Sequence, residues 1–245
     1  MLASAGRGRE VVRAGPFTVT ITGHDANVFL NYAIPDAGAT PSDADIAALL
    51  EAFISRGRTP RLEYLPGLAP AVEPALLAAG FVVAERLPLM ECPPGAEIDQ
   101  PVPTGIELAV PASDDDLLGM LSAQHEAFGE PAPSAEHLAD AREKATAGRF
   151  QLLALDTASG EVVGGGLALP VHDGISEVAG IAVRPKYERR GIGGALTLRL
   201  TRDAHAAGAS LVYLTPGGDA QERVYARVGY RRTGSVLFLS KETAA

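Results

Sequence analysis

Cysteine is nearly absent from this sequence, because Cys92 is the only one among its 245 residues. No disulfide can therefore form within the chain, and such a chain suits a reducing compartment such as the cytoplasm. No apolar run approaches the roughly 20 residues that a membrane-spanning helix needs. Residues 1–10 also hold no apolar stretch of signal-peptide length. We therefore expect a soluble, cytoplasmic protein that does not engage a membrane.

Positive charge is also scarce, since 21 Lys and Arg face 30 Asp and Glu and the net charge is -9. No basic stripe of the kind that binds nucleic-acid phosphates is present, which argues against a nucleic-acid partner. His24, His137 and His205 have no partners at metal-ligand spacing, so no metal site is predicted. An acidic surface favours cationic small molecules such as amines, but it is also an ordinary aid to solubility.

Apolar residues make up 47% of the chain, which is enough for a sizeable core. Residues 93–105 are rich in Pro and Gly, a composition typical of an extended linker. We therefore divide the chain into a first domain, residues 1–92, a linker, residues 93–105, and a second domain, residues 106–245. Both domains have ordinary lengths.

The second domain mixes strand and helix patterns without strict alternation. Ser113 with Asp116 three residues later resembles a capping box and predicts the start of a helix. Apolar periodicity and turn signals predict strands at residues 106–110, 150–155, 162–171, 175–183, 211–214 and 236–239. Helices are expected after Ser113, after Ser134, after the strand that ends at Val183, and over residues 219–228. This order predicts an α/β fold with a mixed sheet flanked by helices.

The first domain echoes the second at a fixed offset of 149 residues. Residues 62–65 (LEYL) fall on residues 211–214 (LVYL), and residues 79–81 (AGF) fall on 228–230 (VGY). A strand expected over residues 28–34 falls on residues 177–183 in the same register. A fixed offset is the mark of a repeat, although few identities also leave two unrelated α/β pieces possible.

A glycine-rich loop, Arg189-Arg190-Gly191-Ile192-Gly193-Gly194-Ala195, joins a predicted strand to a predicted helix. Glycines let backbone N–H groups approach a ligand closely. The free N–H groups and the dipole at a helix N-terminus favour negative charge there. Two arginines beside the loop add cationic donors. The loop therefore predicts a cradle for a pyrophosphate.

Two common nucleotide loops fit this sequence less well. A Walker loop needs Lys and then Ser or Thr after its last glycine, whereas Ala195 and Leu196 follow here. A dinucleotide-binding loop needs a third glycine where Leu196 stands. A merely tight turn between strand and helix remains as the structural alternative.

The loop resembles the signature of the GNAT superfamily of N-acetyltransferases, which is Gln or Arg, two residues, Gly, one residue, and Gly or Ala. The register Arg190, Gly193, Ala195 satisfies it, whereas a register on Gly191 and Gly193 puts Glu188 at the first place. The resemblance implies that acetyl-CoA is the acyl donor and that the backbone of the preceding strand pairs with its pantetheine arm. The residues then implied to bind it are Ile181, Ala182, Val183, Arg189, Arg190, Gly191, Ile192, Gly193, Gly194 and Ala195.

A second match to this family is residues 224–230, VYARVGY, which resemble the late helix whose tyrosine meets the thioester sulfur. The resemblance makes Tyr225 the candidate acid that protonates the departing thiolate. It makes Glu177 the candidate base, because carboxylates at this place in the family often face the acceptor. Gln124 and His125 are weaker candidates for contact with the acceptor. Cys92 lacks a basic neighbour in sequence and is interpreted as an inert thiol.

The offset places different residues at the matching positions of the first domain. Ser42 and Ala44 stand for Gly191 and Gly193, Leu76 for Tyr225, and Val28 for Glu177. We therefore expect a smaller, degenerate GNAT-like domain that packs on the second and helps to wall the acceptor site.

The sequence thus predicts an acetyltransferase that moves an acetyl group from acetyl-CoA to a primary amine of a small molecule or peptide. The amine would attack directly in a ternary complex, because no serine or cysteine is placed to form an acyl-enzyme. The protein is expected to be a monomer or a homodimer. A CoA-binding sensor without turnover and an acceptor other than an amine remain as alternatives.

Overall fold

The computed structural model describes residues 10–22, 31–146 and 148–242. Its contacts divide the chain into two compact units. Unit 1 comprises Met1–Pro88 and Gly234–Ala245, and unit 2 comprises Leu89–Thr233. The chain therefore leaves unit 1 within one strand, β5 (Val82–Cys92), and returns to it within another, β11 (Arg231–Ser240). Over these residues, no helix combines the length and apolar character needed to cross a membrane.

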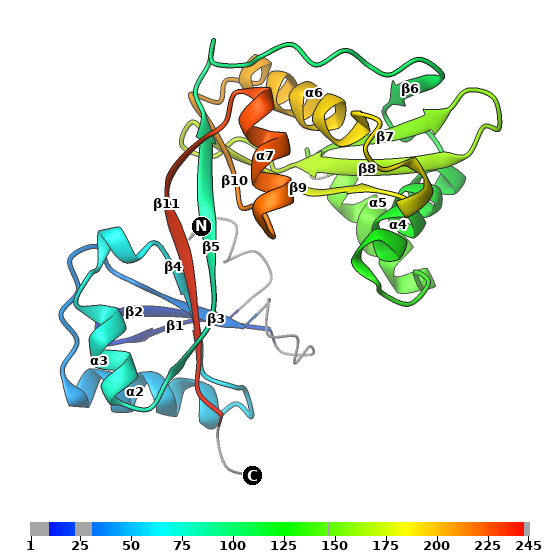
Figure 1. Cartoon of the computed structure of the whole chain (residues 1–245). Helices are drawn as coiled ribbons and strands as arrows, with labels where there is room; N and C mark the ends of the chain where they lie inside the picture. The colour runs from blue at the N-terminus through cyan, green and yellow to red at the C-terminus, as the bar shows by residue number, and fades with distance from the viewer. Residues whose placement is uncertain (1–9, 23–30, 147, 243–245) are drawn as a thin grey trace. The chain divides into compact units, whose positions relative to one another are not determined.

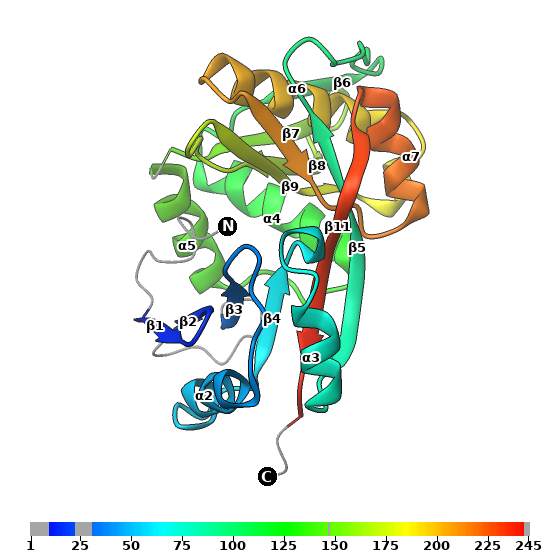
Figure 2. The same ribbon diagram turned by 90° about the vertical axis from the view of Figure 1, so that its left-hand side faces the viewer.

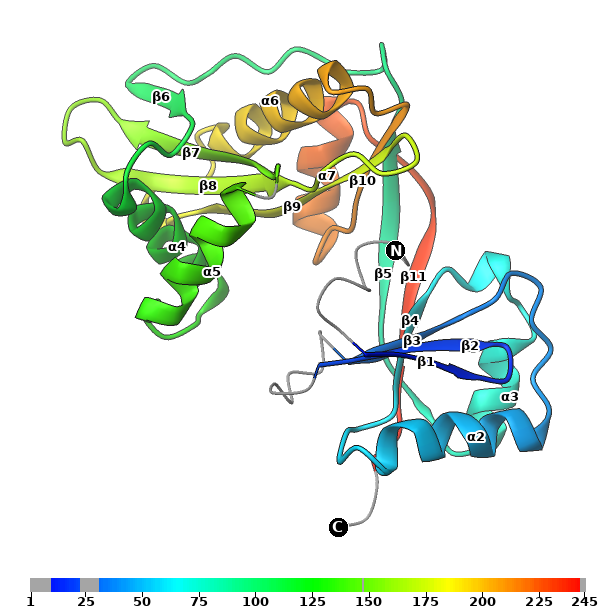
Figure 3. The same ribbon diagram turned by 180° about the vertical axis from the view of Figure 1, so that it is seen from behind.

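Unit 1 is a small sheet with its two described α-helices on one face (Figure 3). Its remaining elements are β1 (Glu10–Ala14), β2 (Phe17–Ile21), β3 (Tyr32–Pro35), α2 (Asp43–Ile54), β4 (Arg61–Tyr64), the 3-10 turn η2 (Pro66–Leu68) and α3 (Val72–Ala78). β1, β2 and β3 pair antiparallel, β3 and β4 pair parallel, and β4 pairs antiparallel with β11. Leu49 and Phe53 of α2 and Leu76 of α3 are fully buried against this sheet, which gives the unit a core of its own.

Unit 2 is a six-stranded sheet in the order β5-β10-β9-β8-β7-β6. Its further elements are β6 (Ile106–Ala109), α4 (Asp114–Phe128), α5 (Ala135–Thr146), β7 (Phe150–Asp156), β8 (Val162–Ala168), β9 (Ile175–Val183), the 3-10 turn η3 (Pro185–Tyr187), α6 (Ile192–Ala206), β10 (Leu211–Leu214) and α7 (Asp219–Val228). β9 and β10 are parallel and the other neighbours are antiparallel, so the sheet is mixed as predicted.

Helices cover both faces of this sheet, with α6 and α7 on one face and α4 and α5 on the other (Figures 1 and 2). The alternation of a strand explains the two cores, because successive side chains point to opposite faces. Leu152 joins the cluster under α6, while its neighbour Leu153 joins the cluster under α4. The helix predicted after Ser113 begins there, because Ser113 and Asp116 form the predicted capping box.

The two units repeat one another at the level of elements, which agrees with the offset found in the sequence. Moving four elements of the first half of the chain by 149 residues places α2 on α6, β4 on β10, α3 on α7 and β5 on β11, with starts that agree within two residues. Val28, the residue matched to Glu177, lies outside the described residues.

The division by contacts differs from the division by sequence at both places where the chain passes between the units. Residues 89–92 were assigned to the first domain, but Met90 and Cys92 pair with β10 and are buried in the core of unit 2. Residues 234–240 were assigned to the second domain, but Leu237 and Leu239 are buried in the core of unit 1. The physical reason is that strand pairing joins residues far apart in the chain, so composition alone does not mark where a unit ends.

Candidate functional site

The N-terminus of α6 is an open row of backbone donors. Gly191 occupies the position before the helix in the left-handed region, at φ 89°, and no side chain caps the first turn. Arg189 also adopts a left-handed conformation, at φ 59°, which is rare for a residue with a side chain. Among the described residues, no protein acceptor receives the N–H groups from Arg189 to Gly194, and Ala195 is the first to bond back along the helix. Such an array is a ready anion site.

Two features add positive potential to this row. Arg189 and Arg190 are exposed beside it, and the Arg190 guanidinium carbon lies 5.2 Å from the centre of the Tyr187 ring. The ring gives this arginine a cation–π contact that limits its freedom. The macrodipole of a 15-residue helix adds partial positive charge at the same end.

The matching position in unit 1 is closed. At the start of α2, the Ser42 hydroxyl accepts a hydrogen bond from the Asp45 N–H, and the Asp45 carboxylate accepts one from the Ser42 N–H. The Asp45 carboxylate also brings negative charge to the place where an anion would bind. Ser42 and Asp45 align with Gly191 and Gly194, so the repeat keeps the helix but not the anion site.

A bulge interrupts β9 next to this loop. The register between β8 and β9 shifts between Gly165 and Leu167, and Gly180 there has a φ of 62°. The amide nitrogen of Gln124, on α4, donates a hydrogen bond to the Gly180 carbonyl oxygen at 2.8 Å. The Gln124 side chain is only 9% exposed, and a Cβ on Gly180 would meet its Nε2 at 2.9 Å. Gln124, a weak candidate for acceptor contact, thus supports the strand itself.

The bulge decides which backbone groups of β9 face its free edge. β10 pairs with β9 only from Ile175 to Glu177, so the later residues of β9 have no described strand on that side. After the bulge, the Arg184 N–H donates to Val163 on β8. Because backbone groups alternate along a strand, those of Val183 and Ile181 point to the free edge. Ala182, between them, pairs with Gly165 on β8.

Glu177 lies where β9 and β10 stop pairing. The Tyr213 hydroxyl, directly opposite on β10, donates a hydrogen bond to Glu177 Oε2 at 3.0 Å. Burial raises the pKa of the Glu177 carboxyl, and the Tyr213 hydrogen bond and the charge of Arg149 only partly offset this effect. A raised pKa is the property that a carboxylate base needs near neutral pH.

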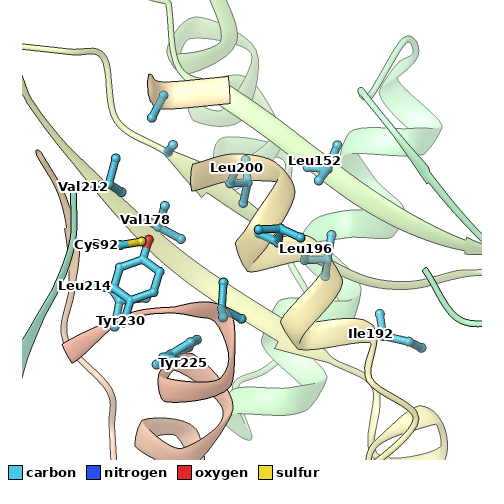
Figure 4. Close-up of a cluster of buried hydrophobic side chains, with 14 of the residues drawn as sticks. Cys92, Leu152, Val178, Ile192, Leu196, Leu200, Val212, Leu214, Tyr225 and Tyr230 are labelled. Carbon is cyan, nitrogen blue, oxygen red and sulfur yellow. The ribbon is translucent and has the colours of Figure 1, made fainter. Parts of the chain in front are cut away.

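Tyr225 lies on α7 and packs into the buried cluster under α6 (Figure 4). Burial raises the pKa of its phenol to about 12. Its ring centre lies 6.3 Å from that of Tyr230, whose hydroxyl is engaged with Thr201 Oγ1 at 2.6 Å. Tyr225 differs, because its hydroxyl makes no hydrogen bond with any described residue. It is therefore a protonated donor left free for another molecule.

The sheet separates the two candidate proton-transfer groups. Val178 and Val212 belong to the cluster that also holds Tyr225, so Glu177 and Tyr213 project to the opposite face, under α4 and α5. The acid candidate thus lies on one side of the free β9 edge and the base candidate on the other.

The structure does not bring the remaining candidates to this edge. His125 bonds the Pro131 carbonyl through Nδ1 at 2.6 Å and packs edge-on against His137. His205 is held by Glu97 and by the Cys92 carbonyl. Cys92 itself is buried, which raises the pKa of its thiol to about 11. A thiol with such a pKa is a poor nucleophile at neutral pH.

Comparison with known proteins agrees with this geometry. The model of the acetyltransferase (GNAT) family matches residues 115–230. This chain carries a GNAT acetyltransferase domain. Members of this family transfer acetyl groups and generally use acetyl-CoA as the donor. No curated protein matches the sequence.

Solved structures extend the likeness to the whole chain. A GCN5-related N-acetyltransferase from Kribbella flavida matches with a TM-score of 0.82 and 25% identity, over 99% of this chain and 93% of its own. A tandem GNAT protein from the clavulanic acid biosynthesis pathway matches with a TM-score of 0.65 and 15% identity, over 96% and 82%. A GCN5-related N-acetyltransferase-like protein from Streptococcus suis gives 0.57 and 12%, over 96% and 90%. The fold is therefore that of two GNAT-like units in one chain.

Proposed function

We propose that this protein transfers an acetyl group from acetyl-CoA to a primary amine of a small molecule or peptide. The observation that carries the proposal is the row of N–H groups from Arg189 to Gly194, at the start of α6, for which the described part of the chain offers no acceptor. The pyrophosphate of CoA supplies the anionic oxygens that such a row accepts. The free edge of β9 continues from this row, so the pantetheine amides can pair with Ile181 and Val183 as an added strand.

The proposed reaction is a direct transfer within a ternary complex. The amine nitrogen attacks the thioester carbonyl, a C–N bond forms, the C–S bond breaks, and the nitrogen loses one proton. Glu177, directly or through a water, accepts that proton, because its raised pKa suits the task. The departing thiolate takes a proton from Tyr225, whose hydroxyl is otherwise unbonded within the described chain. No covalent acyl-enzyme is needed, and the buried thiol of Cys92 is a poor nucleophile.

On the sequence grounds given above, we also propose that the enzyme is cytoplasmic, takes a small amine and needs no metal. The test is thiol release from acetyl-CoA against a panel of amines, with CoA binding measured in parallel. We expect at least one amine to drive turnover, and Tyr225→Phe to lower kcat by about tenfold or more while CoA still binds. Tight CoA binding without turnover of any acceptor would favour a sensor. Absence of CoA binding would contradict the assignment of the loop.

A further inference from the structure

A second carboxylate lies in the same row as Glu177. Tyr213 on β10 has Glu177 directly opposite on β9 and Glu91 directly opposite on β5. Residues opposite each other on neighbouring strands project to the same face, with Cβ atoms about 4.5–5.5 Å apart. The two carboxylates therefore flank one tyrosine on one face of the sheet.

The buried neighbours in the sequence show which face this is. Met90 and Cys92, on either side of Glu91, are buried in the cluster under α6, as are Val212 and Leu214 on either side of Tyr213. Because side chains alternate along a strand, Glu91 and Tyr213 project to the face of the sheet opposite α6, which is also the face of Glu177. On the proposed function, this is the face from which the acceptor reaches the thioester.

No contact with a described residue explains why a carboxylate stands at position 91. Glu91 is partly buried, yet it forms no hydrogen bond or ion pair with any residue that the structure describes. Glu177, by contrast, is engaged by Tyr213 and by the charge of Arg149. Among the described residues, Glu91 is thus the carboxylate of this row without a protein partner, and a cation is the ligand that its charge would attract.

The charges on neighbouring strands decide on which side of Glu177 a second cationic group is favoured. In the order β5-β10-β9-β8-β7-β6, Arg149 immediately precedes β7 on one side of Glu177, and Glu91 lies on the other side. A cationic group on an acceptor whose amine sits at Glu177 is repelled by Arg149 and attracted by Glu91. The net charge of -9 favours the approach of such a molecule.

We propose that Glu91 is a specificity-determining residue that binds a second cationic group of the acceptor, so that the acceptor is a short diamine. The inference rests on the proposed function and deepens it. Each step between neighbouring strands is about 4.7–4.9 Å, so the backbones of Glu91 and Glu177 are roughly 10 Å apart. A diamine with a few methylenes between its nitrogens, together with the reach of the two side chains, covers that span.

The experiment compares two acceptors of equal chain length, 1,4-diaminobutane and n-butylamine, with acetyl-CoA. Wild type, Glu91→Gln and Glu107→Gln are measured side by side. Glu107 is an exposed residue of β6 at the far end of the sheet, so its variant is the matched control. We expect wild type and Glu107→Gln to favour the diamine by about tenfold in kcat/KM, which is about 1.4 kcal/mol. Glu91→Gln should lose that preference through a higher KM for the diamine, with n-butylamine unchanged.

Three results overturn the inference while leaving the proposed function intact. They are a wild type without preference for the diamine, a Glu91→Gln variant that keeps it, and a variant that loses both acceptors equally. If no amine is turned over at all, the proposed function fails separately. Calorimetric binding of 1,4-diaminobutane to the CoA complex then decides, because an affinity equal in Glu91→Gln and wild type rejects the role of Glu91, and an affinity several-fold weaker supports it.

Discussion

The Gln124 side-chain amide donates a hydrogen bond to the Gly180 carbonyl oxygen at 2.8 Å. This bond holds the bulge that turns the backbone groups of Ile181 and Val183 to the free edge of β9. We expect Gln124→Leu to raise the KM for acetyl-CoA several-fold, because the bulge loses its support. The unsatisfied carbonyl should also cost about 1–3 kcal/mol of unfolding free energy. Steady-state kinetics and urea unfolding measure the two effects.

Ser122→Ala, two residues earlier on α4, is the control for this prediction. Among the described residues, the Ser122 hydroxyl bonds only to the Leu118 carbonyl within the same helix, so KM for acetyl-CoA should not change. A Gln124→Leu protein with normal KM for acetyl-CoA, measured well below its unfolding temperature, would show that the bulge does not depend on this bond.

The helix cap of unit 1 can be used to close the anion site of unit 2. The double substitution Gly191→Ser with Gly194→Asp places at α6 the two residues that form the capping box of α2. We expect CoA affinity to fall at least about tenfold, because the new carboxylate takes the N–H groups and repels phosphate. The helical circular dichroism signal should be retained.

Gly208→Ser is the matched control for the closed cap, since Gly208 also has a left-handed φ, 98°, and a Cβ there meets no atom within 4 Å. It should bind CoA like wild type. Unchanged CoA affinity in the double variant would place the phosphates somewhere other than the start of α6.

The pH dependence of kcat/KM tests Glu177. Only the ionised carboxylate accepts a proton, so kcat/KM should rise with pH through the pKa of Glu177, which burial holds above its usual value. Tyr213 donates a hydrogen bond to the charged form and so lowers that pKa. Tyr213→Phe should therefore move the rising limb to higher pH, and Glu177→Gln should lower kcat by about a hundredfold.

Deprotonation of the amine substrate also makes kcat/KM rise with pH. A shift of this rise in Tyr213→Phe distinguishes the titration of Glu177 from that of the amine. A limb at the same pH in wild type and Tyr213→Phe would assign the titration to the amine. The base role of Glu177 would then be rejected.

Glu97 and His205 form a buried pair at the end of α6, with side chains only 12% and 9% exposed. Burial alone would raise the pKa of Glu97, but hydrogen bonds from backbone N–H groups and from His205 lower it below its ordinary value. A lowered pKa contributes stability above the unfolded value that is lost as pH falls through the folded value. We expect Glu97→Gln to lose about 1–3 kcal/mol at pH 7.

This loss should shrink as the pH is lowered towards 3, because wild type then also loses the charge of Glu97. Urea unfolding of both proteins at several pH values measures the difference. A gap that stays constant with pH would mean that packing, and not the charge of Glu97, supports this end of the helix.

Truncation tests the strand that unit 2 takes from residues 89–92. Deleting residues up to Pro94 removes Met90 and Cys92, which are 2% and 0% exposed in the core of unit 2. Each buried side chain of this kind contributes about 2 kcal/mol or more. We expect the fragment 89–233 to unfold cooperatively and the fragment 95–233 to lack a cooperative transition, as followed by circular dichroism. Equal unfolding of both fragments would contradict this role of β5.

Much of unit 2 follows from local signals in the sequence. The Ser113–Asp116 spacing fixes the start of α4, and the strand at residues 175–183 and the helix at 219–228 have the predicted bounds. The open start of α6 was predicted from Gly191, because a glycine without a capping side chain is a local property.

The features that the sequence did not reveal depend on contacts between distant residues. Nothing in the local pattern links Gln124 to Gly180, which lie 56 residues apart. The pairing of Glu91 with Tyr213 was not predicted for the same reason, since the sequence of one strand does not indicate which other strand it pairs with. The hairpin of β1 and β2 was not predicted either, although Gly15 stands at its turn.

The return of the chain to unit 1 at Gly234 has a consequence for its synthesis. β4 lacks its neighbour on one side until β11 has been synthesised, because residues Leu237 to Ser240 pair with Tyr64 to Arg61. Until residues 237–240 have left the ribosome, β4 exposes an unpaired edge and the core of unit 1 lacks Leu237 and Leu239. The half of the protein that is translated first is therefore completed last, because unit 1 needs residues that follow all of unit 2 in the chain.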